Sequence, residues 1–304
     1  MFSSAVYIKT MADILLQKGL RIFLEKGMLN RIQLSNGVEC VPALNGMPCK
    51  SPVYVARKPW RKPSAEEMDL LMSGNENHEN FYFVSLTSIP SYIKKYFEQI
   101  NLADCKSVMD INRITQTASY KKALEQTVLY YEKFAVEKNA AIPHQVYFGE
   151  PNLPHNTFNK KENFFIGMHL DSWEQKSNLE RPAARNRICI NLGKEPRWLL
   201  FYNLSYTDMA NLTGFDGAFL QQPHNMYEVL YKFFGLYNYY PVIKLQINPY
   251  EAYIAPTENI IHDGCTEGTV HKDVNLAIRG YYKMPVDKPA LRGFRNSLIG
   301  LFKK

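Results

Sequence analysis

Hydrophobic and polar positions follow different periods in the two parts of the chain. Residues 119–138 show the three-to-four-residue spacing of an amphipathic helix. The apolar side chains at this spacing are Tyr120, Leu124, Val128 and Tyr131. From residue 145 onward, short apolar runs are bounded by Gly, Pro, Asn and Asp, which is typical of strands. The pattern predicts a helical and mixed segment over residues 1–144 that packs on a strand-rich core over residues 145–304, as one integrated domain.

The first part is expected to contain helices and one hairpin. The expected helices cover residues 10–26, 64–72, 90–100 and 119–138, and a strand is expected over 81–86. Ser64-x-x-Glu67 is a capping-box pattern at the start of one helix. Asn36-Gly37 separates two short runs, which predicts a β-hairpin of residues 31–34 and 38–41. Five prolines within residues 42–63 predict a loop there.

The second part is expected to form about eight short strands. They cover residues 145–148, 163–170, 187–192, 197–203, 242–247 and 251–255, a run ending at His262, and residues 272–282. The runs 187–192 and 197–203 are expected to pair with each other, and a helix over 223–237 interrupts the set. This order predicts an α+β fold built on a double-stranded β-helix, the jelly-roll or cupin-like barrel, braced by the N-terminal helices.

Three side chains are candidate metal ligands. His169 and Asp171 are two residues apart, so on a strand they point to the same face. His262, at the end of another apolar run, supplies a third ligand. Two histidines and one carboxylate on one side of a metal form the facial triad of non-haem Fe(II) oxygenases. Arg279 adds a charge to the next strand, where an apolar residue is the ordinary choice.

This ordered set resembles the Fe(II)/2-oxoglutarate-dependent oxygenases, over about residues 145–283. The resemblance implies Fe(II) held by His169, Asp171 and His262, with 2-oxoglutarate and O₂ as cosubstrates. It also implies that Arg279 pairs with the distal carboxylate of 2-oxoglutarate. Some members have a hydroxyl residue two positions further on, which is Tyr281 here, although a packed core tyrosine is the alternative. In this family, decarboxylation of 2-oxoglutarate to succinate and CO₂ drives abstraction of hydrogen from a substrate carbon.

Further binding residues follow from the same strands and loops. Asn191 is a candidate cosubstrate contact, on a face shared with Arg187 and Cys189, unless Ile188 and Ile190 form the inward face. Arg181 and Arg185, in the loop after the metal motif, suit a small carboxylate-bearing substrate, and an ordinary solvated loop is the alternative.

The hairpin from Asn191 to Arg197 resembles the branch of the family that acts on free amino acids and their derivatives, such as hydroxylases and kainoid synthases. Asp171 argues against halogenation, because halogenases of this branch have Gly or Ala there. Hydroxylation and oxidative ring closure stay equally open, since both begin with the same hydrogen abstraction.

Composition narrows the partners. The net charge of +7 favours anionic ligands, while the dispersed Lys and Arg residues argue against a nucleic-acid surface. Five cysteines without a CxxC pair suggest free thiols in a reducing compartment, so we expect a cytoplasmic protein. No apolar run is long enough for a membrane span, and the oligomeric state stays open. Two other functions remain: an oxygenase acting on protein or nucleic acid, and a jelly-roll binding protein without catalysis.

Overall fold

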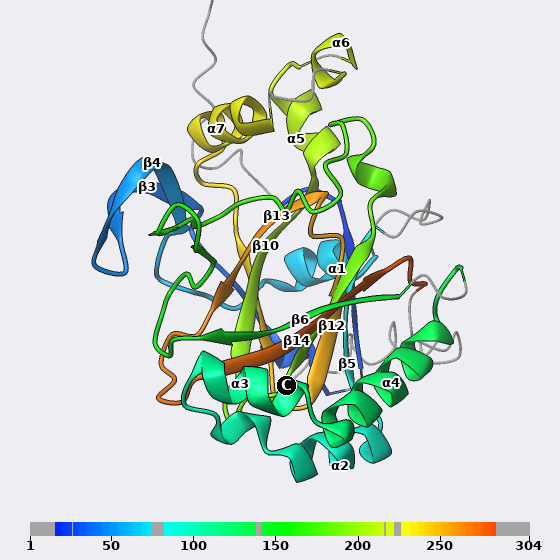
Figure 1. The fold of residues 1–304 in the computed structure, drawn as a ribbon. Helices are drawn as coiled ribbons and strands as arrows, with labels where there is room; N and C mark the ends of the chain where they lie inside the picture. Colours follow the sequence, from blue (N-terminus) through cyan, green and yellow to red (C-terminus); the bar gives the residue numbers. More distant parts are fainter. Residues whose placement is uncertain are drawn as a thin grey trace, which may run out of the picture.

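The computed structural model describes residues 16–25, 27–73, 82–137, 141–215, 217–221 and 226–283. Within these residues, two sheets face each other (Figure 1). The larger sheet has the strand order β1-β5-β12-β9-β14-β6. Its strands are β1 (Arg21–Leu24), β5 (Phe83–Ser88), β12 (Glu251–Ala255), β9 (Asn186–Asn191), β14 (Asp273–Gly280) and β6 (Ile142–Gly149). All neighbours are antiparallel except β1 and β5.

The smaller sheet is antiparallel and has the order β13-β10-β11-β2. Its strands are β13 (Ile260–Cys265), β10 (Arg197–Ser205), β11 (Ile243–Ile247) and β2 (Ile32–Leu34). The chain crosses between the sheets from β9 to β10, from β11 to β12 and from β13 to β14. This alternation is the double-stranded β-helix, so the predicted α+β jelly-roll fold is confirmed. The described strands form these two open sheets and two smaller two-stranded sheets, with no closed barrel.

Helices cover the outer face of the larger sheet. They are α2 (Ser91–Ile100), α3 (Val108–Thr115) and α4 (Ala118–Glu132) (Figure 1). Ile188 and Ile190 of β9 point to this side and pack in one apolar cluster with Ile93 and Phe97 of α2. Arg187 and Cys189 alternate with them and therefore face the space between the sheets. Both faces of β9 are thus covered, one by helices and one by the smaller sheet.

A second group of helices packs near the smaller sheet, at the opposite end of the molecule in Figure 1. They are α5 (Tyr206–Leu212), α6 (Gly217–Leu220) and α7 (Met226–Leu236). Phe233 and Phe234 of α7 contact the ring of Tyr202 on β10, at centroid distances of 5.6 and 6.1 Å. The predicted inserted helix is confirmed in α7, while α5 and α6 were not expected.

Several predictions for the N-terminal part are wrong. Arg21–Leu24 forms β1 where a helix over residues 10–26 was expected, and residues 10–15 lie outside the described part. The hairpin of β2 with residues 38–41 does not form, because β2 pairs with β11. The expected loop over residues 42–63 instead contains the end of β3 (Val38–Leu44) and all of β4 (Met47–Ala56), which pair as a hairpin. Its turn is Asn45-Gly46, with φ of 51° and 77°.

Other predictions hold in part. The capping box is confirmed at α1 (Ala65–Ser73), where the Ser64 N–H donates to Glu67 and the Glu67 N–H donates to the Ser64 hydroxyl. The predicted pairing of β9 with β10 is wrong, since the two strands lie in different sheets. The strand expected over 163–170 is limited to β8 (Phe164–Phe165), which pairs with β7 (Phe158–Asn159), and to a bridge at His169. The expected boundary at residues 144 and 145 falls inside β6.

Candidate metal centre and cavity

The three candidate ligands meet at one end of the smaller sheet. His262 lies on β13, and His169 forms a bridge to it in which each backbone N–H donates to the other residue's carbonyl, at 2.8 and 3.0 Å. The Asp171 N–H donates to the Thr257 carbonyl at 3.1 Å, which fixes the next turn of the same segment. One potential ligand atom from each of His169, Asp171 and His262 lies within 4.8 Å of the other two, and all three residues are buried.

Backbone carbonyls set the orientation of both imidazoles. Nδ1 of His169 lies 2.7 Å from the Gly167 carbonyl, and Nδ1 of His262 lies 3.2 Å from the Ile260 carbonyl. A carbonyl can only accept, so each Nδ1 must carry a proton, and in the neutral imidazole it is Nε2 that has the free lone pair. These Nε2 atoms lie 3.8 and 3.6 Å from the Asp171 carboxylate. Both rings therefore present a ligand nitrogen to the carboxylate side.

Electrostatics keep His262 and Asp171 in their ligating forms. Burial lowers the pKa of His262 to about 4, so its imidazole is neutral at physiological pH. Burial opposes ionisation of Asp171, but Arg187 and then the two histidines outweigh it and hold the pKa of this carboxyl below its usual range. Nη2 of Arg187 lies 2.7 Å from Asp171 Oδ2. Arg187 therefore holds Oδ2, while Oδ1 lies 3.8 Å from Nε2 of His169.

The ligands line a cavity of about 1240 Å³ between the two sheets. Its wall includes Arg187, Arg197, Trp173 and Tyr253 besides the three candidate ligands. Tyr253 lies opposite Cys189 in the β12–β9 pair. Burial and then Cys189 raise the pKa of the Tyr253 hydroxyl, while Arg187 and Arg197 act in the opposite direction. The wall therefore has the buried guanidinium of Arg197, the partly buried guanidinium of Arg187 and a neutral phenol.

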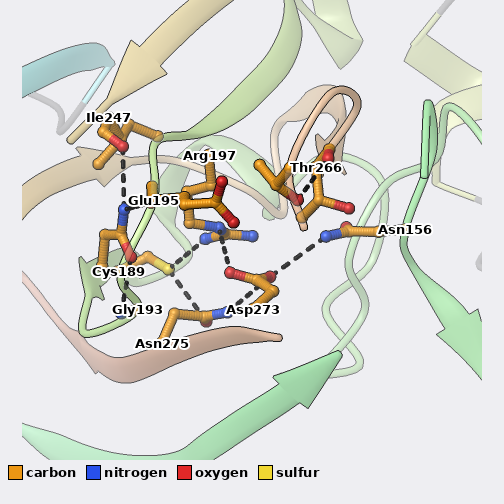
Figure 2. A network of polar contacts seen from close by, with 12 residues as sticks. Asn156, Cys189, Gly193, Glu195, Arg197, Ile247, Thr266, Asp273 and Asn275 are labelled. Atoms are coloured by element: carbon orange, nitrogen blue, oxygen red, sulfur yellow. Dashed lines mark hydrogen bonds and ion pairs between the residues drawn. The ribbon is translucent and has the colours of Figure 1, made fainter. Parts of the chain in front are cut away.

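Arg197 anchors a polar network on this wall, shown in Figure 2. Its Nη1 donates to Cys189 Sγ at 3.0 Å, and its Nε lies 3.2 Å from Asp273 Oδ1. Asn156 and Asn275 each donate to Asp273 Oδ2 at 3.2 Å. Sequence analysis missed Arg197, although it precedes Leu199 and Phe201 on the inward side of β10. That alternation was the signal that could have found it.

The backbone at residue 264 makes room for this network. A Cβ at Gly264 would lie 2.2 Å from Asn156 Oδ1 and 3.1 Å from Arg197 Nη2. Gly264 lies two residues after the candidate ligand His262 on β13. The Arg197 guanidinium, which contacts the Gly264 position, is therefore close to that ligand along the strand.

The contacts of Asn191 and Arg181 favour structural roles over the expected ligand contacts. The Asn191 amide donates to the Glu195 and Ile247 carbonyls and accepts from the Gly193 N–H, which holds the turn after β9 (Figure 2). Nη1 of Arg181 donates to the carbonyls of Asp171 and Glu258, at 3.0 and 2.8 Å. Arg181 is 4% exposed, and its hydrogen bonds connect the segment of His169 and Asp171 to the turn before β13.

Arg279 lies near Trp173, and Arg185 lies near Tyr281. The Arg279 guanidinium carbon is 5.7 Å from the centroid of the Trp173 ring, and that of Arg185 is 5.0 Å from the Tyr281 ring. Arg279 lies opposite Arg187 in the β14–β9 pair. It is therefore at the Asp171 end of the cavity, whereas Arg197 extends over Gly264 on the smaller sheet.

Comparisons with known proteins add a weak likeness. No family model matches the chain, and no curated protein matches it. Among solved structures, it is similar to the Kdo hydroxylase KdoO, a non-heme Fe(II) alphaketoglutarate-dependent dioxygenase. The cobalt(II) complex is 11% identical, with a TM-score of 0.39 over 66% of this chain and 80% of that chain. The apo structure is 12% identical, with a TM-score of 0.39 over 66% and 79%.

Along the chain, none of the described helices combines the length and apolar character of a membrane-spanning segment.

Proposed function

We propose that the protein is a non-haem Fe(II)/2-oxoglutarate-dependent oxygenase. The observation that carries this proposal is the cluster of His169, Asp171 and His262, with two imidazoles fixed by backbone carbonyls and a carboxylate kept ionised. Two histidines and one carboxylate with open positions suit Fe(II) in oxygenases.

The protein's own residues would orient the reactants and exclude water. Bound iron would supply activation of O₂, coupled to conversion of 2-oxoglutarate to succinate and CO₂ and to oxidation of a substrate C–H bond. Arg187 would hold one oxygen of Asp171 while the other faces the metal, since its pair with Oδ2 is buried. The large cavity beside the ligands gives space for both the cosubstrate and a small substrate.

Two arginines are candidates for binding the distal carboxylate of 2-oxoglutarate. The sequence predicts Arg279, and that assignment remains a prediction. We propose Arg197 instead, because it lines the cavity, is 8% exposed and shares its wall with the neutral hydroxyl of Tyr253. A guanidinium can bind a carboxylate through two parallel hydrogen bonds. Arg197→Lys should therefore raise the apparent 2-oxoglutarate constant at least about tenfold, because an ammonium cannot make this fork.

The substrate proposed is small and carries an acidic group, and an amino-acid derivative is one such class. The arginine-rich cavity wall and the net charge of +7 support an anionic substrate. Hydroxylation would insert one oxygen atom of O₂ into the C–H bond, while ring closure would leave that atom in water. Atom balance gives the mass change relative to the substrate. A product heavier by about 16 Da indicates hydroxylation, and a product lighter by about 2 Da indicates ring closure.

The experiment that tests the function is metal binding followed by turnover. His169→Ala and His262→Ala should each abolish Co(II) or Fe(II) binding in an anaerobic titration, and also O₂-dependent succinate release. His271→Ala is the matched control, because its exposed ring bonds to Glu195 outside the cluster, and it should bind metal normally. Wild-type metal binding by both cluster variants would refute the assignment.

A further inference from the structure

An aromatic ring and three arginines form a rim at the Asp171 end of the cavity. The guanidinium carbons of Arg187 and Arg279 each lie 5.7 Å from the centroid of the Trp173 ring. Trp173 lines the cavity and is 44% exposed, so it is within reach of a ligand. Arg185 lies over Tyr281, two residues after Arg279 in the chain. We refer to Trp173, Arg185, Arg187 and Arg279 as the arginine rim.

The arginine rim has more donors than acceptors. Arg187 pairs with Asp171 at 2.7 Å, and Arg185 lies 3.4 Å from Glu174. Over the part of the chain that the structure describes, Arg279 has no acidic partner and no side-chain hydrogen bond. The Nε atoms of all three arginines are buried without a hydrogen-bond acceptor. Buried donors without partners are costly, so this arrangement indicates a place for acceptor oxygens.

The position of Arg279 connects the rim to the candidate metal centre. Asp273, Asn275 and Ala277 of β14 line the cavity, and Arg279 is the next residue in this alternating row. Its neighbour across the β14–β9 pair is Arg187, which contacts the candidate ligand Asp171. A group bound to Arg279 would therefore lie near the Arg187–Asp171 pair, on the side of the exposed Trp173 ring.

Charge balance indicates that Arg279 pairs with an anion other than the cosubstrate. The acidic groups at the rim, Asp171 and Glu174, are already paired with Arg187 and Arg185. A divalent metal adds two positive charges, which the two carboxylates of 2-oxoglutarate would offset. The charge of Arg279 would then remain without a counter-ion, and a second anion is needed.

We propose that Arg279, beside Trp173, binds a carboxylate of the primary substrate. This rests on the proposed function, and it assigns Arg279 to the substrate rather than to 2-oxoglutarate. The acid would be held by the guanidinium through a charge-assisted bond, and the adjoining part of the substrate would lie against the Trp173 ring. The enzyme would then select small acids whose reacting carbon lies near the carboxylate.

The test is binding of benzoate to the metal-free full-length protein by calorimetry, with benzamide as the uncharged partner. Benzoate should bind more tightly than benzamide. Arg279→Leu should weaken benzoate binding at least about tenfold, as expected for loss of a charged hydrogen bond. Arg279→Lys should lose less, since it retains the charge. Arg113→Leu removes an equal charge outside the rim and should change the affinity less than about threefold, because this 78% exposed side chain pairs with Asp110 on α3. Phenyl phosphate is titrated in a third arm. If phenyl phosphate binds and benzoate does not, the site recognises phosphate, and the choice of carboxylate is overturned.

Two further outcomes would overturn the proposal. Equal affinity for benzoate and benzamide would show that no anion is recognised, and unchanged benzoate affinity in folded Arg279→Leu would exclude this residue. Anaerobic binding of 2-oxoglutarate with Fe(II) separates the roles, because Arg279→Leu should leave it within about threefold of wild type. The benzoate titration uses no metal, so its failure is distinct from failure of metal binding at His169 and His262.

Discussion

At the residue scale, the cavity wall depends on buried charges that are paired with each other. Arg187 pairs with Asp171 and Arg197 pairs with Asp273, and all four residues lie between the sheets. Buried pairs add little net stability, but removing one partner is strongly destabilising because the other charge stays buried. These pairs therefore fix the position of the wall and of one candidate ligand more than they stabilise the fold.

Glu258 is a buried acid with a different role. It is 2% exposed, and its carboxylate accepts the Glu174 N–H at 3.1 Å. Burial, with Glu174 and Asp171 adding repulsion, raises the pKa of Glu258 to about 6 from an ordinary 4.5. The folded-state pKa is above the unfolded value, so the protonated acid favours folding. This stability is fully present below pH 4.5 and is lost as the pH rises through about 6.

Glu258→Gln should therefore stabilise the metal-free protein at pH 7.5 by about 1–2 kcal/mol, because an amide accepts the same N–H without a charge. The gain should disappear near pH 4.5, which urea unfolding at both values would measure. Glu98→Gln is the control, since that side chain of α2 is 46% exposed, and it should change stability by less than about 0.5 kcal/mol. A Glu258→Gln protein less stable than wild type at pH 7.5 would contradict the expectation.

A residue of the site can be predicted from sequence only where the pattern shows which face of its strand points inward. His169, Asp171 and His262 were found from spacing and residue type, and the structure brings them together. Arg187 was noted beside Cys189, but its direction was open because Ile188 and Ile190 were an equally good inward face. Both faces of β9 are buried, so alternation of apolar and polar residues does not distinguish them.

At the element scale, the predictions that failed concern which strands pair with each other across a turn. Asn36-Gly37 and Asn45-Gly46 are the same dipeptide, and only the second connects two paired strands. The first cannot be distinguished locally, because the partner of β2 is β11, about two hundred residues away in sequence. Likewise, β9 and β10 are joined by a short turn yet enter different sheets. Local turn chemistry gives the bend, and only tertiary packing decides the partner.

Gly167 is the turn residue on which the metal segment depends. It has φ of +70°, and a Cβ there would lie 2.6 Å from the Tyr54 carbonyl of β4. That carbonyl accepts the Met168 N–H, and the Gly167 carbonyl is the partner of His169 Nδ1. A side chain at this position would therefore separate the segment from β4 and turn the imidazole.

Gly167→Ala should lower stability by more than Gly46→Ala and should also weaken metal binding. Gly46 has a similar φ of +77° with open space around it, so its substitution measures backbone strain alone, about 1–2 kcal/mol. Gly167→Ala adds a steric clash with backbone, for a total above about 2 kcal/mol. Chemical unfolding and an anaerobic Co(II) titration of both variants measure the two effects. Equal losses of stability with unchanged metal affinity in both would refute this role of Gly167.

At the scale of the whole molecule, the N-terminal part completes the core. β1 and β5 extend the larger sheet, and β2 extends the smaller one, all from the segment that sequence analysis expected to pack outside the barrel. The alternating strands after residue 145 predicted the jelly roll correctly because their pattern is local. Strands over residues 31–34 and 81–86 were expected, but their places in the two sheets could not be foreseen, since their pairing joins distant parts of the chain.

A fragment of residues 141–304 tests whether the second part folds alone, with β6 kept whole. It would lose β5 from the edge of β12 and β2 from the edge of β11, which leaves unpaired backbone groups on both sheets. It would also lose α2, α3 and α4, which cover Ile188 and Ile190. We expect no cooperative thermal transition and no metal binding by this fragment, and recovery of both when residues 1–140 are co-expressed with it. Cooperative unfolding and normal Co(II) binding by the fragment alone would instead place all the determinants of the fold and the metal centre after residue 140.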